Sequence, residues 1–154
     1  MSDLPRVRVA AVLLIDGRIV LVQHAKAGRT YHLLPGGGVE RGEPVGEALT
    51  REVREETGLD CRLVRLLFVS DTISPDGARH LVNLTFLGEV AGGQLLRRPE
   101  DPRVAGVVLA EPERLGDYDL RPPIAEELRE AAREGFEVEA RYLGALWTEE
   151  TTEP

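Results

Sequence analysis

The sequence predicts an α/β protein in which a mixed β-sheet lies between helices. Alternating runs rich in Val, Leu and Ile, which are typical of strands, occur in both halves of the chain. Two helical segments, each introduced by a proline, follow separate groups of these runs. The length of 154 residues favours one domain. The order strands, helix, strands, helix therefore predicts a sheet covered by helices.

Turn residues divide the first part of the chain into a hairpin and a short third strand. Asp16-Gly17 is a strong two-residue hairpin signal, because both residue types tolerate the positive φ that such a turn needs. Pro35 and the three glycines after it end the third strand. The expected elements are strands over residues 6–15 and 18–24, a loop over 25–30 and a short strand over 31–34.

A helix is expected over residues 45–57, since Pro44 suits the start of a helix and Gly58 supplies the usual C-terminal stop. The later expected elements are strands over residues 62–70, 80–89 and 104–110, turns at 74–77 and 92–93, a helix over 123–134 and a closing strand within 136–147. We expect residues 1–147 to form a single domain and residues 148–154 to form a flexible C-terminal tail.

Composition narrows the class of protein. The formal net charge of −8 argues against binding to a nucleic acid polymer, which needs clustered Lys and Arg. There is no run of about 18 apolar residues and no signal-peptide pattern at the start, so no membrane association is expected. Cys61 is the only cysteine, which leaves no intrachain disulfide. These features predict a cytoplasmic protein.

The helix at residues 45–57 places three glutamates beside its apolar face. With about 100° per residue and Val45 at about 0°, Leu49 falls at about 40°. Glu56 then falls at about 20°, Glu52 at about −20° and Glu55 at about −80°. A charged helix usually directs such residues to solvent, whereas this spacing sets them inside the apolar stripe or at its edge.

Glu52, Glu55 and Glu56 are spaced i, i+3, i+4, so their side chains meet on one surface of the helix. Three carboxylates crowded beside a core repel one another and lose hydration. A hard divalent cation relieves both costs, and carboxylate oxygens suit Mg²⁺, Mn²⁺ or Ca²⁺. The pattern therefore indicates a metal site, with a solvated charged face as the alternative.

The glycine-rich loop before this helix, residues 34–40, fits the same picture. Glycines let backbone groups approach a ligand closely, although a tight turn would use them equally well. The loop lacks the Gly-Lys-Ser/Thr of a P-loop and the G-x-G-x-x-G spacing of a dinucleotide fingerprint.

Taken together, these segments resemble a complete Nudix box. The match consists of Gly37, five residues, Glu43, seven residues, and then Arg51-Glu52-Val53-Arg54-Glu55-Glu56-Thr57-Gly58-Leu59. The strand order and the second helix extend the resemblance over most of the chain. The resemblance implies a Nudix-type α/β/α sandwich with a strand–loop–helix–loop catalytic unit.

The resemblance also implies the residues of the site. Glu52, Glu55 and Glu56, joined by the backbone carbonyl of Gly36, would bind Mg²⁺, for which Mn²⁺ can substitute. The residues expected to brace the loop against the helix are Gly37, Glu43, Arg51 and Gly58.

The implied reaction is hydrolysis of a phosphoanhydride bond in a nucleoside diphosphate that is linked to another group. Bound Mg²⁺ neutralises charge and activates water, and a carboxylate accepts the proton of that water. Glu52 is the first candidate for this base. A later loop offers Glu100 and, after it, Asp101, and solvated loop acids are the alternative reading of both.

Other residues must select the substrate. Lys26, Arg29 and Arg79 could meet phosphates or simply be surface charges, and Tyr31 could stack on a base or belong to the core. Pro75 stands sixteen residues past the box, where ADP-ribose-type members often have a proline, although Ser74-Pro75-Asp76-Gly77 is also an ordinary turn. We expect ADP-ribose or a nucleotide sugar as the substrate.

Several alternatives remain open. The rival substrates are a nucleoside triphosphate or its oxidised form, and a dinucleoside polyphosphate. From other classes, a non-catalytic nucleotide sensor, an interaction protein with an acidic surface and a diphosphate isomerase compete with the hydrolase. A sensor usually has a damaged box, whereas all three glutamates are present here. A homodimer is a weaker expectation drawn from the family.

Overall fold

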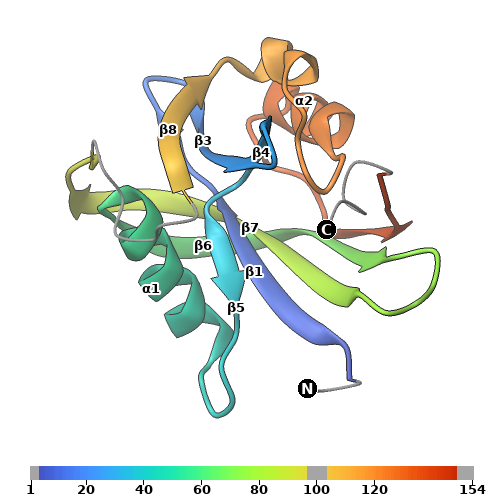
Figure 1. Cartoon of the computed structure of the whole chain (residues 1–154). Helices are drawn as coiled ribbons and strands as arrows, with labels where there is room; N and C mark the ends of the chain where they lie inside the picture. The colour runs from blue at the N-terminus through green and yellow to red at the C-terminus, as the bar shows by residue number, and fades with distance from the viewer. Residues whose placement is uncertain (1–3, 97–103, 149–154) are drawn as a thin grey trace.

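The computed structural model describes residues 4–96 and 104–148, and its long strands form a mixed sheet that crosses the molecule (Figure 1). This sheet has the strand order β5-β1-β7-β6-β9. Strands β1 and β7 run parallel, as do β6 and β9, whereas β1 pairs with β5 and β6 pairs with β7 in antiparallel register. The bounds of these strands are β1 Arg6–Val12, β5 Gly36–Gly38, β6 Leu59–Ile73, β7 His80–Gly93 and β9 Arg141–Ala145.

A second, antiparallel sheet is built around β3, which pairs with β2, β4 and β8. Its strands are β2 Leu14–Ile15, β3 Arg18–Lys26, β4 Arg29–Leu33 and β8 Val104–Ala110. The helical elements are α1 Val45–Thr57, the 3₁₀ helix η1 Pro112–Asp117 and α2 Ala125–Arg133.

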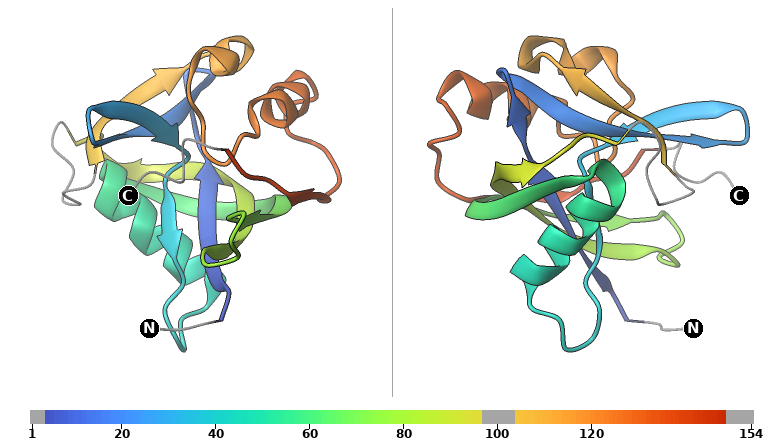
Figure 2. Two further views of the ribbon diagram at one scale, coloured as in Figure 1. Left: turned by 45° about the vertical axis from the view of Figure 1, so that its right-hand side comes forward. Right: turned by 90° about the vertical axis from the view of Figure 1, so that its left-hand side faces the viewer.

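The alternation of β1 explains why the five-stranded sheet lies between two helices (Figure 2). Val9 and Ala11 pack into one buried cluster with α1, whereas Ala10 and Val12 pack into the other cluster with α2. Successive strand residues point to opposite faces, so an apolar run through β1 supplies both halves of the core. The predicted α/β sandwich with a mixed sheet is therefore confirmed.

The turns of the second sheet were predicted only in part. Asp16 and Gly17 have φ values of 51° and 76°, as the predicted hairpin requires. The loop expected over residues 25–30 is wrong, because β3 continues to Lys26 and pairs with β4 from Arg29. Ala27 and Gly28 form the connecting turn, with φ values of 52° and 78°. Alanine rarely adopts a positive φ, so Ala27 does not mark a turn in the sequence.

The long strands extend beyond their predicted ends. Strand β6 starts directly after Gly58, and its register shifts break the alternation that marks a strand in sequence. The turn expected at Gly92-Gly93 is wrong, because Gly93 is still part of β7 and pairs with Leu59. Helix α2 begins at Ala125, two residues after Pro123.

Helix α1 has the predicted bounds. Pro44 is its N-cap, and Gly58 ends it with a φ of 80°. Within the described residues, no helix is long and apolar enough to cross a membrane. The single domain over residues 1–147 stays a prediction, and the predicted tail at 148–154 lies outside the described residues except for Thr148.

Candidate active site

Of the three glutamates predicted to bind metal, Glu52 and Glu56 are buried against strand β5. Glu56 is 2% exposed, and its Oε1 accepts a hydrogen bond of 2.7 Å from the backbone N–H of Gly36. Glu52 is 8% exposed and lies one turn earlier on the same face of α1. The helix therefore places two carboxylates where a globular protein normally places apolar side chains.

The glycines of β5 are required by how closely the strand approaches its neighbours. A Cβ on Gly37 would overlap the carboxylate of Glu52, whose Oε1 would be 2.6 Å away. A Cβ on Gly36 would overlap the backbone carbonyl of Val9 on β1. The glycine run thus sets β5 between the first strand and the acidic face of the helix.

Arg51 ties the loop after β5 to the helix. Its Nε donates to Oε2 of Glu43 at 2.8 Å, and its Nη2 donates to Oε1 of Glu43 at 3.0 Å and to the carbonyl of Gly38 at 3.2 Å. This fork lowers the pKa of Glu43 from its ordinary value of 4.5 to about 2. Arg51 Nη1 also donates to Oε1 of Glu52 at 2.9 Å.

The three glutamates have different electrostatic environments. Burial raises the pKa of Glu52, and the nearby Glu55 and Glu56 act in the same direction, while the hydrogen bond from Arg51 opposes them. The side chain of Glu55 is 44% exposed, and its Oε1 is 3.6 Å from Nη1 of Arg51. Glu52 and Glu56 are thus shielded from solvent, whereas Glu55 is partly exposed at the edge of the cluster.

The donor chemistry of this cluster fits a hard divalent cation. Carboxylate and carbonyl oxygens are what Mg²⁺ and Mn²⁺ prefer, and a cation would offset the cost of keeping Glu52 and Glu56 buried and charged. The side chains do not form a closed cage as they stand, since no three Asp, Glu, His or Cys groups among the described residues are grouped to hold an ion. Glu55 would have to turn inward, and a cation would compete with Arg51 for Glu52.

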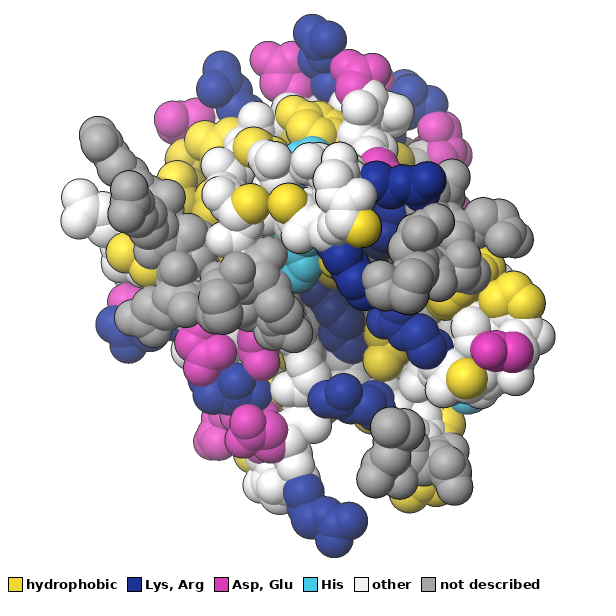
Figure 3. All heavy atoms as spheres, viewed as in Figure 1, with side chains coloured by type: hydrophobic (Ala, Val, Ile, Leu, Met, Phe, Trp, Pro, Cys, Tyr) yellow, Lys and Arg dark blue, Asp and Glu magenta, His cyan; other side chains and the backbone are white. Residues whose placement is uncertain are grey.

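A cavity of about 600 Å³ opens beside Glu56 and β5. Figure 3 shows Lys and Arg side chains gathered around this hollow. Glu56 is the only carboxylate among the described residues that line it. The lining cations are Arg6, Arg8, Lys26, Arg29, Arg79 and Arg121. A basic hollow in a chain of net charge −8 indicates a small anionic ligand.

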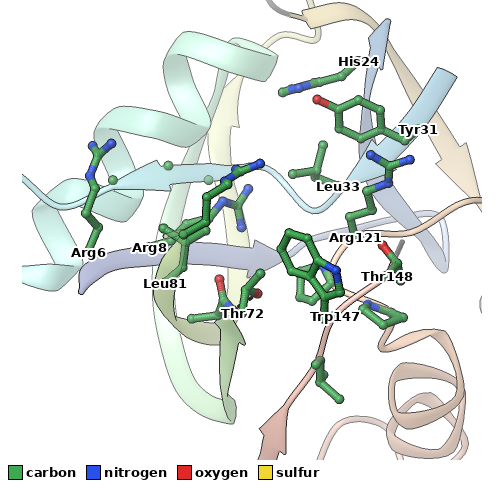
Figure 4. Close-up of a pocket in the computed structure, with 18 of the residues that line it drawn as sticks. Arg6, Arg8, His24, Tyr31, Leu33, Thr72, Leu81, Arg121, Trp147 and Thr148 are labelled. Carbon is green, nitrogen blue, oxygen red and sulfur yellow. Dashed lines mark hydrogen bonds between the residues drawn. The ribbon is translucent and has the colours of Figure 1, made fainter. Parts of the chain in front are cut away.

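The structure brings the predicted substrate residues to this cavity. Arg29, Tyr31 and Arg79 all line it, together with Lys26. Tyr31 is half-buried, and the guanidinium of Arg121 lies 4.1 Å from the centre of its ring. Figure 4 shows these two side chains next to each other. One face of Tyr31 is therefore covered within the protein.

His24 also reaches the cavity, beside the acidic cluster. Its Nε2 is 3.9 Å from Oε2 of Glu56, and the ring of His24 lies 5.3 Å from that of Tyr31. Pro75, the predicted marker of an ADP-ribose substrate, has a local explanation. Pro75 is exposed in a turn closed by Ser74, whose hydroxyl donates to Asp76 at 2.7 Å. The local turn therefore accounts for this proline.

Glu100 and Asp101, the loop candidates for the general base, lie outside the described residues. Arg8, Asn83, Arg121 and Trp147, which come from distant parts of the chain, also line the cavity and were not predicted as site residues. A signal existed only for Asn83, which is a lone amide inside the apolar run of β7.

Comparison with known proteins defines the family. The NUDIX domain family model matches residues 4–134, so the chain belongs to the Nudix domain family. The chain is 37% identical over 92 residues to the ADP-ribose pyrophosphatase of Methanocaldococcus jannaschii, which covers 59% of this chain and 54% of that protein. It is 45% identical over 80 residues to the 8-oxo-dGDP phosphatase NUDT18 of Danio rerio, which covers 50% of this chain and 22% of that protein.

The structural comparison agrees with the sequence comparison. A NUDIX hydrolase from Nitrosomonas europaea superposes with a TM-score of 0.74 at 24% identity, over 86% of this chain and 90% of that one. This likeness confirms the predicted Nudix-type fold. The matched region spans about half of the first relative and about a fifth of the second.

Proposed function

We propose that this protein is a Mg²⁺-dependent pyrophosphohydrolase that cuts the phosphoanhydride bond of a nucleoside diphosphate linked to another group, with ADP-ribose or a nucleotide sugar as the substrate. The observation that carries the proposal is the burial of Glu52 and Glu56 against the glycine strand β5, at the edge of a cavity lined by cations. Mn²⁺ is expected to substitute for Mg²⁺.

Each part of the site has a proposed role. Glu52, Glu55 and Glu56, with the carbonyl of Gly36, would hold the cation, which when bound neutralises phosphate charge and acidifies a water. Glu52 is the first candidate for the base that accepts the proton of the attacking water, because it is a buried carboxylate at the place where the cation would bind. Glu100 is the alternative base.

The remaining residues position the substrate. Arg29 and Arg79 would bind phosphate oxygens from the cavity wall, and the Arg51–Glu43 pair would keep β5 and α1 in register. The water oxygen attacks one phosphorus, the P–O–P bridge breaks, and the leaving phosphate departs with the electron pair of that bond.

The name of the first relative supports a substrate of this class, because ADP-ribose is a nucleoside diphosphate linked to another group. The name of the second relative contains 8-oxo-dGDP, a nucleoside diphosphate without a second group. A cavity of about 600 Å³ has the size of typical small-molecule sites. The cytoplasmic location and the homodimer are predictions that the structure of one chain does not test.

The decisive experiment measures products from a nucleotide panel with Mg²⁺ or with EDTA. The panel contains ADP-ribose, nucleotide sugars, nucleoside triphosphates, 8-oxo-dGDP and dinucleoside polyphosphates. We expect Mg²⁺-dependent cleavage of ADP-ribose or a nucleotide sugar into two phosphomonoesters. Preferred turnover of a triphosphate or of 8-oxo-dGDP would replace the proposed substrate and leave the hydrolase.

Two matched variants test the site itself. Glu56→Gln removes one charge from the buried face of α1, and we expect turnover to fall by about 100-fold or more. Glu47→Gln makes the same change on the exposed face of α1 and should leave turnover unchanged. A wild-type protein that binds nucleotides saturably and cleaves none of them would be a sensor and would refute the enzyme.

A further inference from the structure

A buried amide forms part of the floor of the cavity. On β7, Leu84 and Phe86 pack toward α1, so Asn83, Thr85 and Leu87 face α2 on the opposite side of the sheet. A strand covered on both faces is normally a continuous apolar run. Asn83 is 3% exposed and lines the cavity, at the point where the core face of the sheet becomes the cavity floor.

The hydrogen bonds of this amide are only half satisfied. Asn83 Nδ2 donates to Oγ1 of Thr72 at 2.9 Å and to Oγ of Ser70 at 3.4 Å. Asn83 Oδ1 is buried and has no hydrogen-bond partner among the described residues. Buried acceptors are almost always paired in folded proteins, so an unpaired one beside a cavity indicates a donor supplied by a ligand.

A second unpaired group lies at the same cavity. Trp147, on the segment after β9, lines it, and its Nε1 is buried without a hydrogen-bond partner among the described residues. Figure 4 shows this indole extending toward the part of the cavity lined by Leu81 and Thr72. An indole N–H can only donate. The cavity thus offers one acceptor and one donor beside a flat aromatic surface.

These features match a nucleobase better than a sugar. A base presents a π-face, and its edge carries N–H donors and ring acceptors side by side. A sugar offers hydroxyls but no flat face. The apolar part of the cavity lining, which includes Leu81, Pro122 and Leu146, suits the ring of a base.

We propose that Asn83 is the base-selecting residue of this site: its Oδ1 accepts a hydrogen bond from an N–H on the edge of the substrate's nucleobase, and Trp147 Nε1 donates to an acceptor of the same base. The inference rests on the proposed function, since it takes the ligand to be a nucleotide. Adenine and guanine both supply the required pair of groups, whereas unsubstituted purine lacks the N–H.

The test measures nucleotide binding without turnover. Trp147 is the only tryptophan, so its fluorescence reports ligand entry into the cavity. ADP, GDP and purine riboside 5′-diphosphate are titrated in EDTA. For the wild type, we expect one of the two nucleotides, ADP or GDP, to bind more tightly than the other. The dissociation constant of that nucleotide should be at least about 10-fold lower than that of purine riboside 5′-diphosphate.

Variants separate base selection from folding, because the readout is a ratio of affinities. Asn83→Ala should reduce the preference to within about 2-fold, whereas Asn83→Asp keeps an acceptor and should retain it. Thr85→Val is the matched control. Thr85 is a buried polar residue on the same face of β7, does not line the main cavity, and should leave the preference unchanged when replaced.

Two results would overturn the proposal. Equal binding of purine riboside 5′-diphosphate by the wild type would mean that the ligand gives Asn83 no donor, as when water in the adjoining pocket of about 10 Å³ satisfies it. A preference that persists in Asn83→Ala would assign selection to another residue. If the protein hydrolyses nucleotides but shows no preference for ADP or GDP over purine riboside 5′-diphosphate, only the role of Asn83 is refuted. If it shows this preference but hydrolyses no nucleotide, only the proposed hydrolase activity is refuted.

Discussion

Replacing Gly37 by alanine should separate activity from stability. A Cβ at Gly37 would overlap Cδ and both oxygens of the Glu52 carboxylate, whereas ordinary contacts begin at 3.4 Å, so the carboxylate must retreat by about 1 Å. The obstacle is the end of a flexible side chain, and Gly37 has no positive φ, so folding should cost only about 1 kcal/mol. A displacement of about 1 Å at a reacting group can cost about 100-fold in rate.

The assay compares kcat with the free energy of unfolding in urea for three glycine variants. Gly37→Ala should lose about 100-fold in kcat. Gly46→Ala has its nearest neighbour, Leu63 Cδ1, at 3.9 Å, so kcat should stay unchanged and the helical Gly-to-Ala change should raise stability by up to about 1 kcal/mol. Gly36→Ala meets the backbone of Val9 and should cost about 3 kcal/mol of stability or more. Wild-type kcat in Gly37→Ala would refute the role given to the position of Glu52.

Three further predictions concern stability and reactivity. Because Arg51 lowers the pKa of Glu43 to about 2 from an ordinary 4.5, the stability that this carboxylate contributes is present above pH 4.5 and is lost as the pH falls toward 2, so Glu43→Gln should flatten the profile of melting temperature against pH in that window. An unchanged slope would count against the ion pair. Burial raises the pKa of the Cys61 thiol, and Ellman's reagent should label the folded protein at least about 10-fold more slowly than the unfolded one. Leu49→Ala should cost about 2–5 kcal/mol in urea unfolding, because Leu49 on α1 is fully buried in the cluster that includes Val9 and Ala11 of β1, whereas a cost below about 1 kcal/mol would contradict that packing.

The elements that could be predicted from the sequence are those that begin or end at a cap or turn residue. Pro44 and Gly58 define α1, and Asp16-Gly17 defines the first hairpin, because each signal acts on its own backbone. Ala27 and Gly93 were misread for opposite reasons. Ala27 adopts a left-handed turn without a turn residue's chemistry, and Gly93 looks like a turn but remains in β7.

The part of the site that lies on one helix could be predicted from the sequence, and the cavity could not. One helix carries Glu52, Glu55 and Glu56, so helical spacing alone sets them on one surface, and the structure buries the first and last of them. The cavity is lined by residues of β1, β3, β4, β5, β6, β7 and α1, of the segment before α2 and of the segment after β9. Asn83 and Trp147 line the same cavity only because strands distant in sequence pair with each other. The periodicity of apolar residues does not predict which strands pair.

Direct cation binding tests whether Glu52, Glu55 and Glu56 on α1 form a metal site. Mn²⁺ is titrated into the wild type, Glu52→Gln, Glu55→Gln, Glu56→Gln and the surface control Glu47→Gln, and free Mn²⁺ is followed by its paramagnetic resonance signal. We expect at least about 10-fold weaker Mn²⁺ binding in the three site variants and wild-type binding in the control. Equal Mn²⁺ affinity in Glu56→Gln and Glu47→Gln would contradict this expectation.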